Sequence, residues 1–295
     1  MDAITWLGEP PELRSPVLVC AFRGWNDAAG SATAALATVA SSLDTEEVAT
    51  IDPEEFFDFQ AARPTIRLTE GQTREIEWPG NRLLAARAPG ADHDLVLLDG
   101  TEPNLRWRTF SEGVAEAAER LGTELVVTLG ALIADVAHTL PVPITGLASD
   151  AELVERLGLS RSNYEGPTGI VGVVHDSCRR RGMTSASLWA AVPHYIAAVP
   201  NPKAALALLR RLESLIGVAA DATELEQEAD QFDEQIARAV AENPEIEELV
   251  ARLEREQAEA QQLDPDEELP SADALARDFE RFLKQRGEGM EGRDR

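Results

Sequence analysis

Residues 16–27 read Pro16-Val17-Leu18-Val19-Cys20-Ala21-Phe22-Arg23-Gly24-Trp25-Asn26-Asp27. The first seven form a short apolar run, and the last five form a polar segment with a glycine. Residues 28–43 follow and are rich in alanine, which predicts a helix. A buried strand, a tight turn and a helix therefore come in succession, and this order is typical of α/β proteins.

The same order returns further along the chain. A strand predicted at 94–99 precedes a helix at 109–121, and a strand is predicted at 124–129. We predict two more strands, at 169–174 and 185–192, with a helix at 175–181 between them. This alternation predicts an α/β fold of three layers, in which a mostly parallel sheet carries helices on both faces.

Two segments interrupt or close this alternation. Residues 65–88 alternate apolar and polar side chains in two runs around Glu70-Gly71, which predicts an antiparallel hairpin. Residues 203–215 are amphipathic and predict a last core helix. We therefore place an α/β core at 1–220.

Residues 221–295 differ sharply in composition, with 24 acidic and 9 basic side chains. Apolar residues recur there at helical spacing, and Asn243-Pro244 predicts a break between two helices. Ser271 could cap a further helix, and the chain from 287 onward predicts disorder. We predict an acidic helical extension whose apolar stripe either binds a partner or packs on the core.

The composition excludes several classes of protein. The net charge of −26 would repel phosphate backbones, so we expect no nucleic acid partner. No apolar run reaches the length of a membrane helix, and residues 1–11 do not resemble a secretory signal, so we expect a cytoplasmic protein. Cys20 and Cys178 each lie in an apolar segment and predict reduced thiols, with no metal site and no cofactor.

The loops after the predicted strands are where a ligand site would lie in such a sheet. The first loop brings Arg23, Asn26 and Asp27 to the start of a helix, where backbone N–H groups could hold an anion. Alternatively, Asn26 or Asp27 caps that helix and satisfies the N–H groups itself. Both interpretations remain open at this point.

Later loops add five further candidates. Glu102, Asn104 and Arg106 lie within five positions and could orient a ligand, although an ion pair from Arg106 to Glu102 or Asp135 would explain them equally well. His138 and His194 could act as bases or could be hydrogen-bonded structural residues. Motifs of common enzymes are absent, so no reaction is predicted and an enzyme is not the favoured class.

Several ordered blocks together resemble the PAC2 family in its actinobacterial branch. The blocks are Gly24-Trp25-Asn26-Asp27-Ala28-Ala29-Gly30, Glu102-Pro103-Asn104-Leu105-Arg106-Trp107, Leu129-Gly130-Ala131-Leu132, Tyr164-Glu165-Gly166-Pro167-Thr168-Gly169 and Ser187-Leu188-Trp189-Ala190-Ala191-Val192-Pro193-His194-Tyr195. The resemblance runs from about residue 16 to about residue 283. It implies a three-layer α/β fold similar to that of nucleoside phosphorylases and peptidyl hydrolases.

The resemblance also implies a function. Eukaryotic and archaeal relatives are chaperones that bind proteasome α-subunit rings through a C-terminal hydrophobic-Tyr-any tail. This sequence ends Gly292-Arg293-Asp294-Arg295 and lacks that motif. We therefore expect a chaperone-like or scaffold protein with a protein partner, and the proteasome core is a candidate.

Two other functions remain open. The clustered loop residues could bind or transform a nucleoside-like or other anionic small molecule. The chain could also serve mainly to form a homo-oligomer, which we expect in any case.

Overall fold

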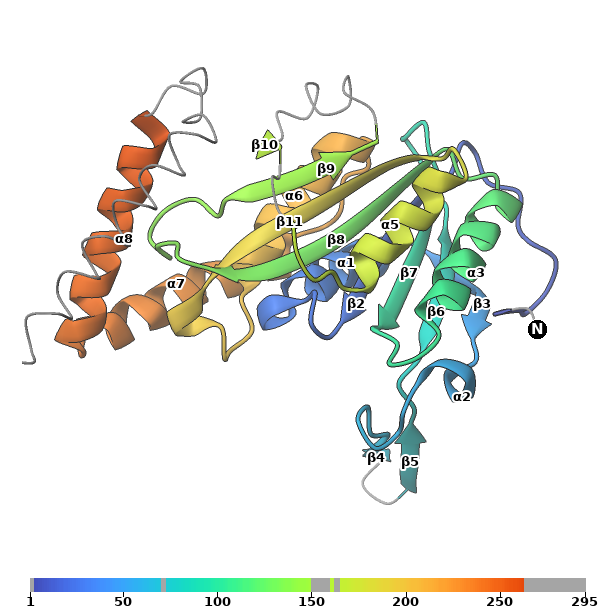
Figure 1. The fold of residues 1–295 in the computed structure, drawn as a ribbon, viewed down its shortest axis with the longest axis horizontal. Helices are drawn as coiled ribbons and strands as arrows, with labels where there is room; N and C mark the ends of the chain where they lie inside the picture. The colour runs from blue at the N-terminus through green and yellow to red at the C-terminus, as the bar shows by residue number, and fades with distance from the viewer. Residues whose placement is uncertain (1–2, 70–72, 150–159, 162–164, 263–295) are drawn as a thin grey trace, which may run out of the picture.

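The structure is a computed structural model that describes residues 3–69, 73–149, 160–161 and 165–262 (Figure 1). Within these residues nine strands form one sheet in the order β1-β3-β6-β7-β2-β8-β11-β9-β10. The strands are β1 (Ile4–Trp6), β2 (Val17–Arg23), β3 (Thr45–Ile51), β6 (Asn81–Ala86), β7 (Leu95–Thr101), β8 (Leu125–Ala134), β9 (Ile144–Ala148), β10 (Ser160–Arg161) and β11 (Thr184–Pro193).

Parallel pairing is confined to two parts of the sheet. The four central strands β7, β2, β8 and β11 are mutually parallel, and β10 is parallel to β9 at one end. The flanking pairs β1–β3, β3–β6, β6–β7 and β9–β11 are antiparallel. The predicted parallel sheet thus forms the centre of a mixed sheet, with antiparallel pairs on both sides of it.

Helices cover both faces of the sheet (Figure 1). On one face, α1 (Ser31–Ser42) and α6 (Pro202–Ile216) bury Leu36 and Leu208 against the sheet. On the other, α3 (Trp107–Arg120) and α5 (Ile170–Arg180) bury Phe110 and Val174. Since alternate side chains of a strand point to opposite faces, each central strand supplies both cores. The predicted three-layer α/β fold is confirmed.

The prediction of a strand at 169–174 is wrong. This segment is the first half of α5, and the buried residues Ile170, Val171, Val174 and Cys178 follow helical spacing. Its run of β-branched side chains favours a strand locally, but a short apolar run cannot distinguish the two structures. In the folded chain this segment packs against β8, β11 and α3, and this tertiary packing stabilises the helix over the strand.

The predicted hairpin at 65–88 is confirmed in its first half. β4 (Thr65–Thr69) pairs antiparallel with β5 (Thr73–Glu77), and this small sheet extends away from the body of the molecule (Figure 1). The second half joins the main sheet as β6. The alternating pattern therefore predicted the strands, while the partner of β6 depended on tertiary structure.

The chain after the core continues as α7 (Thr223–Ala241) and α8 (Pro244–Gln262), which meet at the predicted break. α7 lies against α6 and buries Leu225, Ala229 and Phe232. α8 buries Val250 and Leu253 against Ala137. The apolar stripe of these two helices therefore packs on the core, and the predicted helix after Ser271 lies outside the described residues.

Three short helices, η1 (Ala28–Gly30), α2 (Pro53–Phe56) and η2 (His194–Ile196), complete the described chain together with the connecting loops. In the part of the chain that the structure describes, no helix combines the length and apolar character needed to cross a membrane.

Candidate functional site

The carboxyl ends of the central strands meet at one edge of the sheet, as the parallel pairing requires. Arg23 and Thr101 end β2 and β7 opposite one another, and Ala134 and Pro193 do so in β8 and β11. Arg23, at the end of β2, and the segments that follow these strands carry the eight predicted site residues. We call this region the carboxyl edge, and it is where a ligand site would lie in such a fold.

Asn26 and Glu102 join two of these loops to the start of α5. Asn26 is fully buried, and its Nδ2 donates to Glu102 Oε1 over 2.7 Å. The same oxygen accepts from the backbone N–H of Ile170 at 2.9 Å, and Glu102 Oε2 accepts from the N–H of Trp25 at 3.3 Å. Glu102 thus places negative charge at the positive end of the α5 dipole.

Gly169 makes this junction possible. A Cβ added at Gly169 would lie 2.2 Å from the Asn26 side-chain amide, so only glycine lets α5 approach so closely. Asn26 Oδ1 is buried and has no hydrogen-bond partner in the described residues. The junction is therefore tightly closed, with one acceptor left unpaired.

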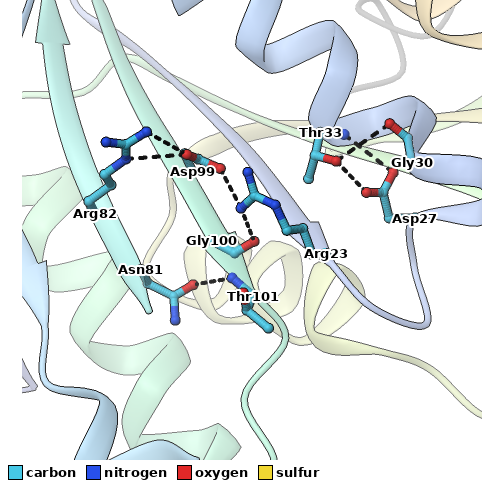
Figure 2. A network of polar contacts seen from close by, with 9 residues as sticks. All are labelled: Arg23, Asp27, Gly30, Thr33, Asn81, Arg82, Asp99, Gly100 and Thr101. Atoms are coloured by element: carbon cyan, nitrogen blue, oxygen red, sulfur yellow. Dashed lines mark hydrogen bonds and ion pairs between the residues drawn. The ribbon is translucent and has the colours of Figure 1, made fainter. Parts of the chain in front are cut away.

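The N-cap residue of α1 is Gly30 rather than Asn26 or Asp27, but the Asp27 carboxylate still satisfies N–H groups of the first turn, as the capping interpretation expects. Its Oδ1 accepts from the N–H group of Ala32 at 2.7 Å. The same oxygen accepts from the N–H of Thr33 at 3.3 Å, and Oδ2 accepts from the Thr33 hydroxyl at 2.5 Å (Figure 2). Burial raises the pKa of Asp27, while these bonds oppose the rise. Because the carboxylate occupies the helix start, an anion there would meet like charge.

Arg23 belongs to a second network of polar contacts, separate from that of Asp27. Its Nη1 donates to Asp99 Oδ1 at 2.9 Å and to the Gly100 carbonyl at 3.3 Å, while Asp99 Oδ2 accepts from Arg82 Nη2 at 3.0 Å (Figure 2). One carboxylate therefore serves two guanidiniums. Arg82 and Asp99 are not among the residues predicted from the sequence, because their contact depends on the β6–β7 register, which pairs them directly.

Asn104 and Arg106 connect the loop after β7 to α2. Asn104 Oδ1 accepts from the N–H of Asp58 at 3.0 Å. Arg106 forms an ion pair with Glu55, rather than with Glu102 or Asp135, and its guanidinium lies 5.9 Å from the Phe56 ring centroid. The backbone of Arg106 is left-handed, with φ of 55°, which is uncommon for a residue with a side chain. These contacts hold the loop in place.

His138 belongs to the interface between core and extension. Its Nδ1 lies 2.7 Å from the Tyr195 hydroxyl, and Lys203 Nζ donates to its carbonyl at 2.6 Å. Lys203 also pairs with Asp233 of α7 at 2.9 Å. Burial lowers the pKa of His138, and so does the nearby charge of Lys203.

The helix α8 completes that interface. Gln257 Oε1 accepts from the N–H of Ala137 at 2.7 Å, and Thr139 donates its hydroxyl to Glu254 Oε1 at 2.5 Å. His194 lies outside this interface and is partly exposed, with its Nδ1 3.0 Å from Asp135 Oδ1. The two histidines thus have different polar partners, and Asp135 pairs with His194 rather than with His138, although both rings meet the ring of Tyr195 edge-on.

The eight predicted residues therefore form separate groups. Asn26 and Glu102 bond directly, whereas Asp27, Arg23, the Asn104–Arg106 loop and the two histidines have other partners. A cavity of about 320 Å³ lies between η1, α7 and the start of α6 and is lined by none of the eight. Its lining includes Ala29, Ala34, Pro200, Leu225, Glu228 and Phe232.

Metal and thiol chemistry find little support in the described residues. No group of three or more His, Cys, Asp or Glu side chains gathers there as metal ligands would. Cys20 and Cys178 are buried, and burial raises the pKa of both, to about 12 for Cys178. A thiol of such high pKa is a poor nucleophile.

The loops and strands of the carboxyl edge lie within the region that matches a known family. Residues 21–240 match the sequence pattern described as the PAC2 family. The chain belongs to the PAC2 family. The carboxyl edge, its junction with α5 and the start of α7 all fall inside the PAC2 match.

Solved PAC2 structures agree with this assignment. A PAC2 family protein from Streptomyces avermitilis is 46% identical, with 80% of this chain and 99% of that chain covered and a TM-score of 0.74. A proteasome-assembly chaperone homologue from Mycobacterium tuberculosis is 44% identical, with 79% and 99% covered and a TM-score of 0.73. No curated protein matches the chain.

One more distant structure shares the fold alone. An archaeal proteasome activator from Pyrococcus furiosus is 18% identical, with 81% of this chain and 99% of that chain covered and a TM-score of 0.65. The α/β architecture of the PAC2 family thus extends to proteins of low sequence similarity, and shared architecture does not by itself assign a function.

Proposed function

We propose that this PAC2 protein acts by binding other proteins, as a chaperone-like or scaffold protein, and that proteasome subunits are the first partners to test. The observation that carries the proposal is the closed carboxyl edge. Glu102 accepts three hydrogen bonds there, from Asn26, Ile170 and Trp25, and so occupies the place where a small ligand would bind.

Large apolar side chains are exposed at this same edge. Trp25 exposes 64% of its surface on the loop after β2, and Leu105 exposes 49% on the loop after the neighbouring strand β7. Tryptophan is enriched among the residues that dominate protein interfaces. The similarity to the Mycobacterium tuberculosis proteasome-assembly chaperone homologue supports the same reading.

The experiment is a direct binding measurement by biolayer interferometry. Immobilised full-length protein is exposed to purified actinobacterial proteasome α subunits, β subunits and assembled core. We expect saturable binding to one of them, and Trp25→Ala should weaken it about tenfold or more, as is common for interface tryptophans. Leu7→Ala is the control and should leave binding unchanged, since Leu7 is 58% exposed and directly follows β1, an outermost strand of the sheet that lies four strands away from β2.

Two outcomes would count against this proposal. Absence of binding to all three proteasome preparations would remove the proteasome as partner. Binding that Trp25→Ala and Leu7→Ala weaken equally would show that the carboxyl edge is not the surface used.

A second candidate function is the binding of a small molecule. One observation favours it, namely the buried Asn26 Oδ1 without a partner beside Glu102. A ligand or water that donates a hydrogen bond would satisfy this acceptor. A thermal-shift screen with nucleosides, nucleotides, sugar phosphates and amino acids tests it, because a ligand at about 100 times its dissociation constant adds roughly 2.7 kcal/mol of stability. A hit that Asn26→Ala abolishes would favour this function over protein binding.

A further inference from the structure

The β4–β5 hairpin has one apolar face. Ile66 lies directly opposite Ile76, and Leu68 lies on the same side because it is two residues from Ile66. These three side chains are 63%, 57% and 65% exposed. Trp78, just after β5, is 52% exposed and meets the ring of Phe59 edge-on at 4.8 Å between centroids. Such a cluster on one face marks an interaction surface.

The hairpin also differs in charge from the rest of the molecule. Arg67 pairs with Glu77 at 2.7 Å on the polar face, while Arg74 lies opposite Leu68 and so on the apolar face. Residues 63–78 hold three arginines and three glutamates, a net charge of 3 − 3 = 0. The whole chain, by contrast, carries a net charge of −26. The apolar face of the hairpin, which carries Arg74, thus suits an apolar surface with negative charge.

The cavity beside α7 has these two properties. Its lining includes Ala29, Ala34, Leu225 and Phe232 together with the carboxylate of Glu228. Val199, 46% exposed, directly precedes Pro200 in the lining. α7 carries six acidic residues and one arginine, a net of 6 − 1 = 5 negative charges.

We propose that the hairpin of one copy docks in the α7 cavity of a second copy, with Arg74 facing Glu228. The distribution of charge favours a second copy of this chain over other partners as the occupant of the cavity. A basic partner would be attracted to α7 and α8 rather than to the hairpin, whereas the chain itself offers an apolar and acidic receptor. Since the hairpin and the cavity are different surfaces, the contact is head-to-tail and builds a ring or an open chain.

The docking also explains why the hairpin can persist. A two-stranded sheet with nothing packed on its apolar face is only marginally stable in water. Burial of Ile66, Leu68 and Ile76 in a neighbouring copy would supply the missing packing. This inference goes beyond the proposed function and does not depend on it.

The test is sedimentation velocity of the full-length protein over a range of concentrations. We expect the wild type to self-associate, and Ile66→Asp and Arg74→Glu each to raise the dissociation constant about tenfold or more. Glu228→Arg should do the same. The double variant that combines Arg74→Glu with Glu228→Arg restores opposite charges and should recover much of the association.

Controls separate docking from folding. Arg67→Ala alters the polar face of the same hairpin and should leave association unchanged, and thermal melting of each variant verifies that the core is folded. A monomeric wild type would overturn the proposal, and so would association that Ile66→Asp leaves intact. Loss of association in both single charge variants without recovery in the double variant would overturn the pairing of hairpin and cavity.

Discussion

The carboxyl edge and the β4–β5 hairpin lie in the same chain and use opposite kinds of side chain. At the edge, polar groups such as Asn26 and Glu102 bond to one another and leave little to offer a ligand. On the hairpin, apolar groups such as Ile66 and Leu68 are more than half exposed and have little to contact within their own chain. The difference teaches that polar residues gathered in loops can be structural, while binding capacity lies where apolar surface is left open.

The largest expected effect tests the edge. Glu102→Ala leaves the Asn26 amide, the N–H of Ile170 and the N–H of Trp25 without their acceptor, so we expect a loss of about 3 kcal/mol in the free energy of unfolding. Urea denaturation measures it. Glu102→Gln keeps the shape of the side chain and one acceptor oxygen, so it should lower the free energy of unfolding by less than Glu102→Ala does. Ile66→Ser on the hairpin should leave the free energy of unfolding of the monomer almost unchanged. Equal losses of stability for Glu102→Ala and Ile66→Ser would contradict the difference between the two regions.

A second prediction concerns the approach of α5 to the edge. The Cβ introduced by Gly169→Ala would meet the Asn26 amide at 2.2 Å, so we expect a loss of about 2 kcal/mol. Gly8→Ala is the control, because nothing lies within 4 Å of a Cβ at that position. Thermal unfolding compares the two. An unchanged melting temperature for Gly169→Ala would mean that α5 can move away from Asn26 without cost.

The third prediction uses pH at the interface with the extension. The pKa of His138 is lowered in the folded state, chiefly by burial, so the unfolded chain binds the proton more readily. Stability should therefore fall as the pH drops through about 6.5, the ordinary histidine pKa, towards the lower folded value. His138→Gln should make this dependence shallower between pH 7 and pH 5, as measured by urea unfolding at several pH values. A steeper dependence in the variant would contradict it.

The smallest expected effect is at Arg106. Arg106→Gly removes the ion pair with Glu55, which is partly exposed and contributes about 0.5 kcal/mol. Glycine also relieves the left-handed backbone, which offsets that loss. We expect the free energy of unfolding to stay within about 0.5 kcal/mol of the wild type. A loss several times larger would show that this loop supports the edge more strongly than its contacts indicate.

Particular residues show how far sequence reasoning reaches into the site. The contact of Asp27 with the first turn of α1 was one of two interpretations, because an acid a few positions before a helix, here four before Ser31, is a local signal. The partners of Asn26, Arg23 and Arg106 lie 76, 76 and 51 positions away in sequence, and no local pattern points to them. Whether the eight residues bind a ligand stays a prediction.

The sequence by itself determined the central strands, the helices around them except the first half of α5, the break at Asn243-Pro244 and the membership in the PAC2 family. These follow from periodicity, turn residues and ordered motifs, which act over a few positions. Tertiary structure alone decided that 169–174 is helical, that Glu102 closes the carboxyl edge and that the extension packs its apolar stripe on the core. The physical reason is that burial and hydrogen bonding between distant segments outweigh local preference where the two conflict.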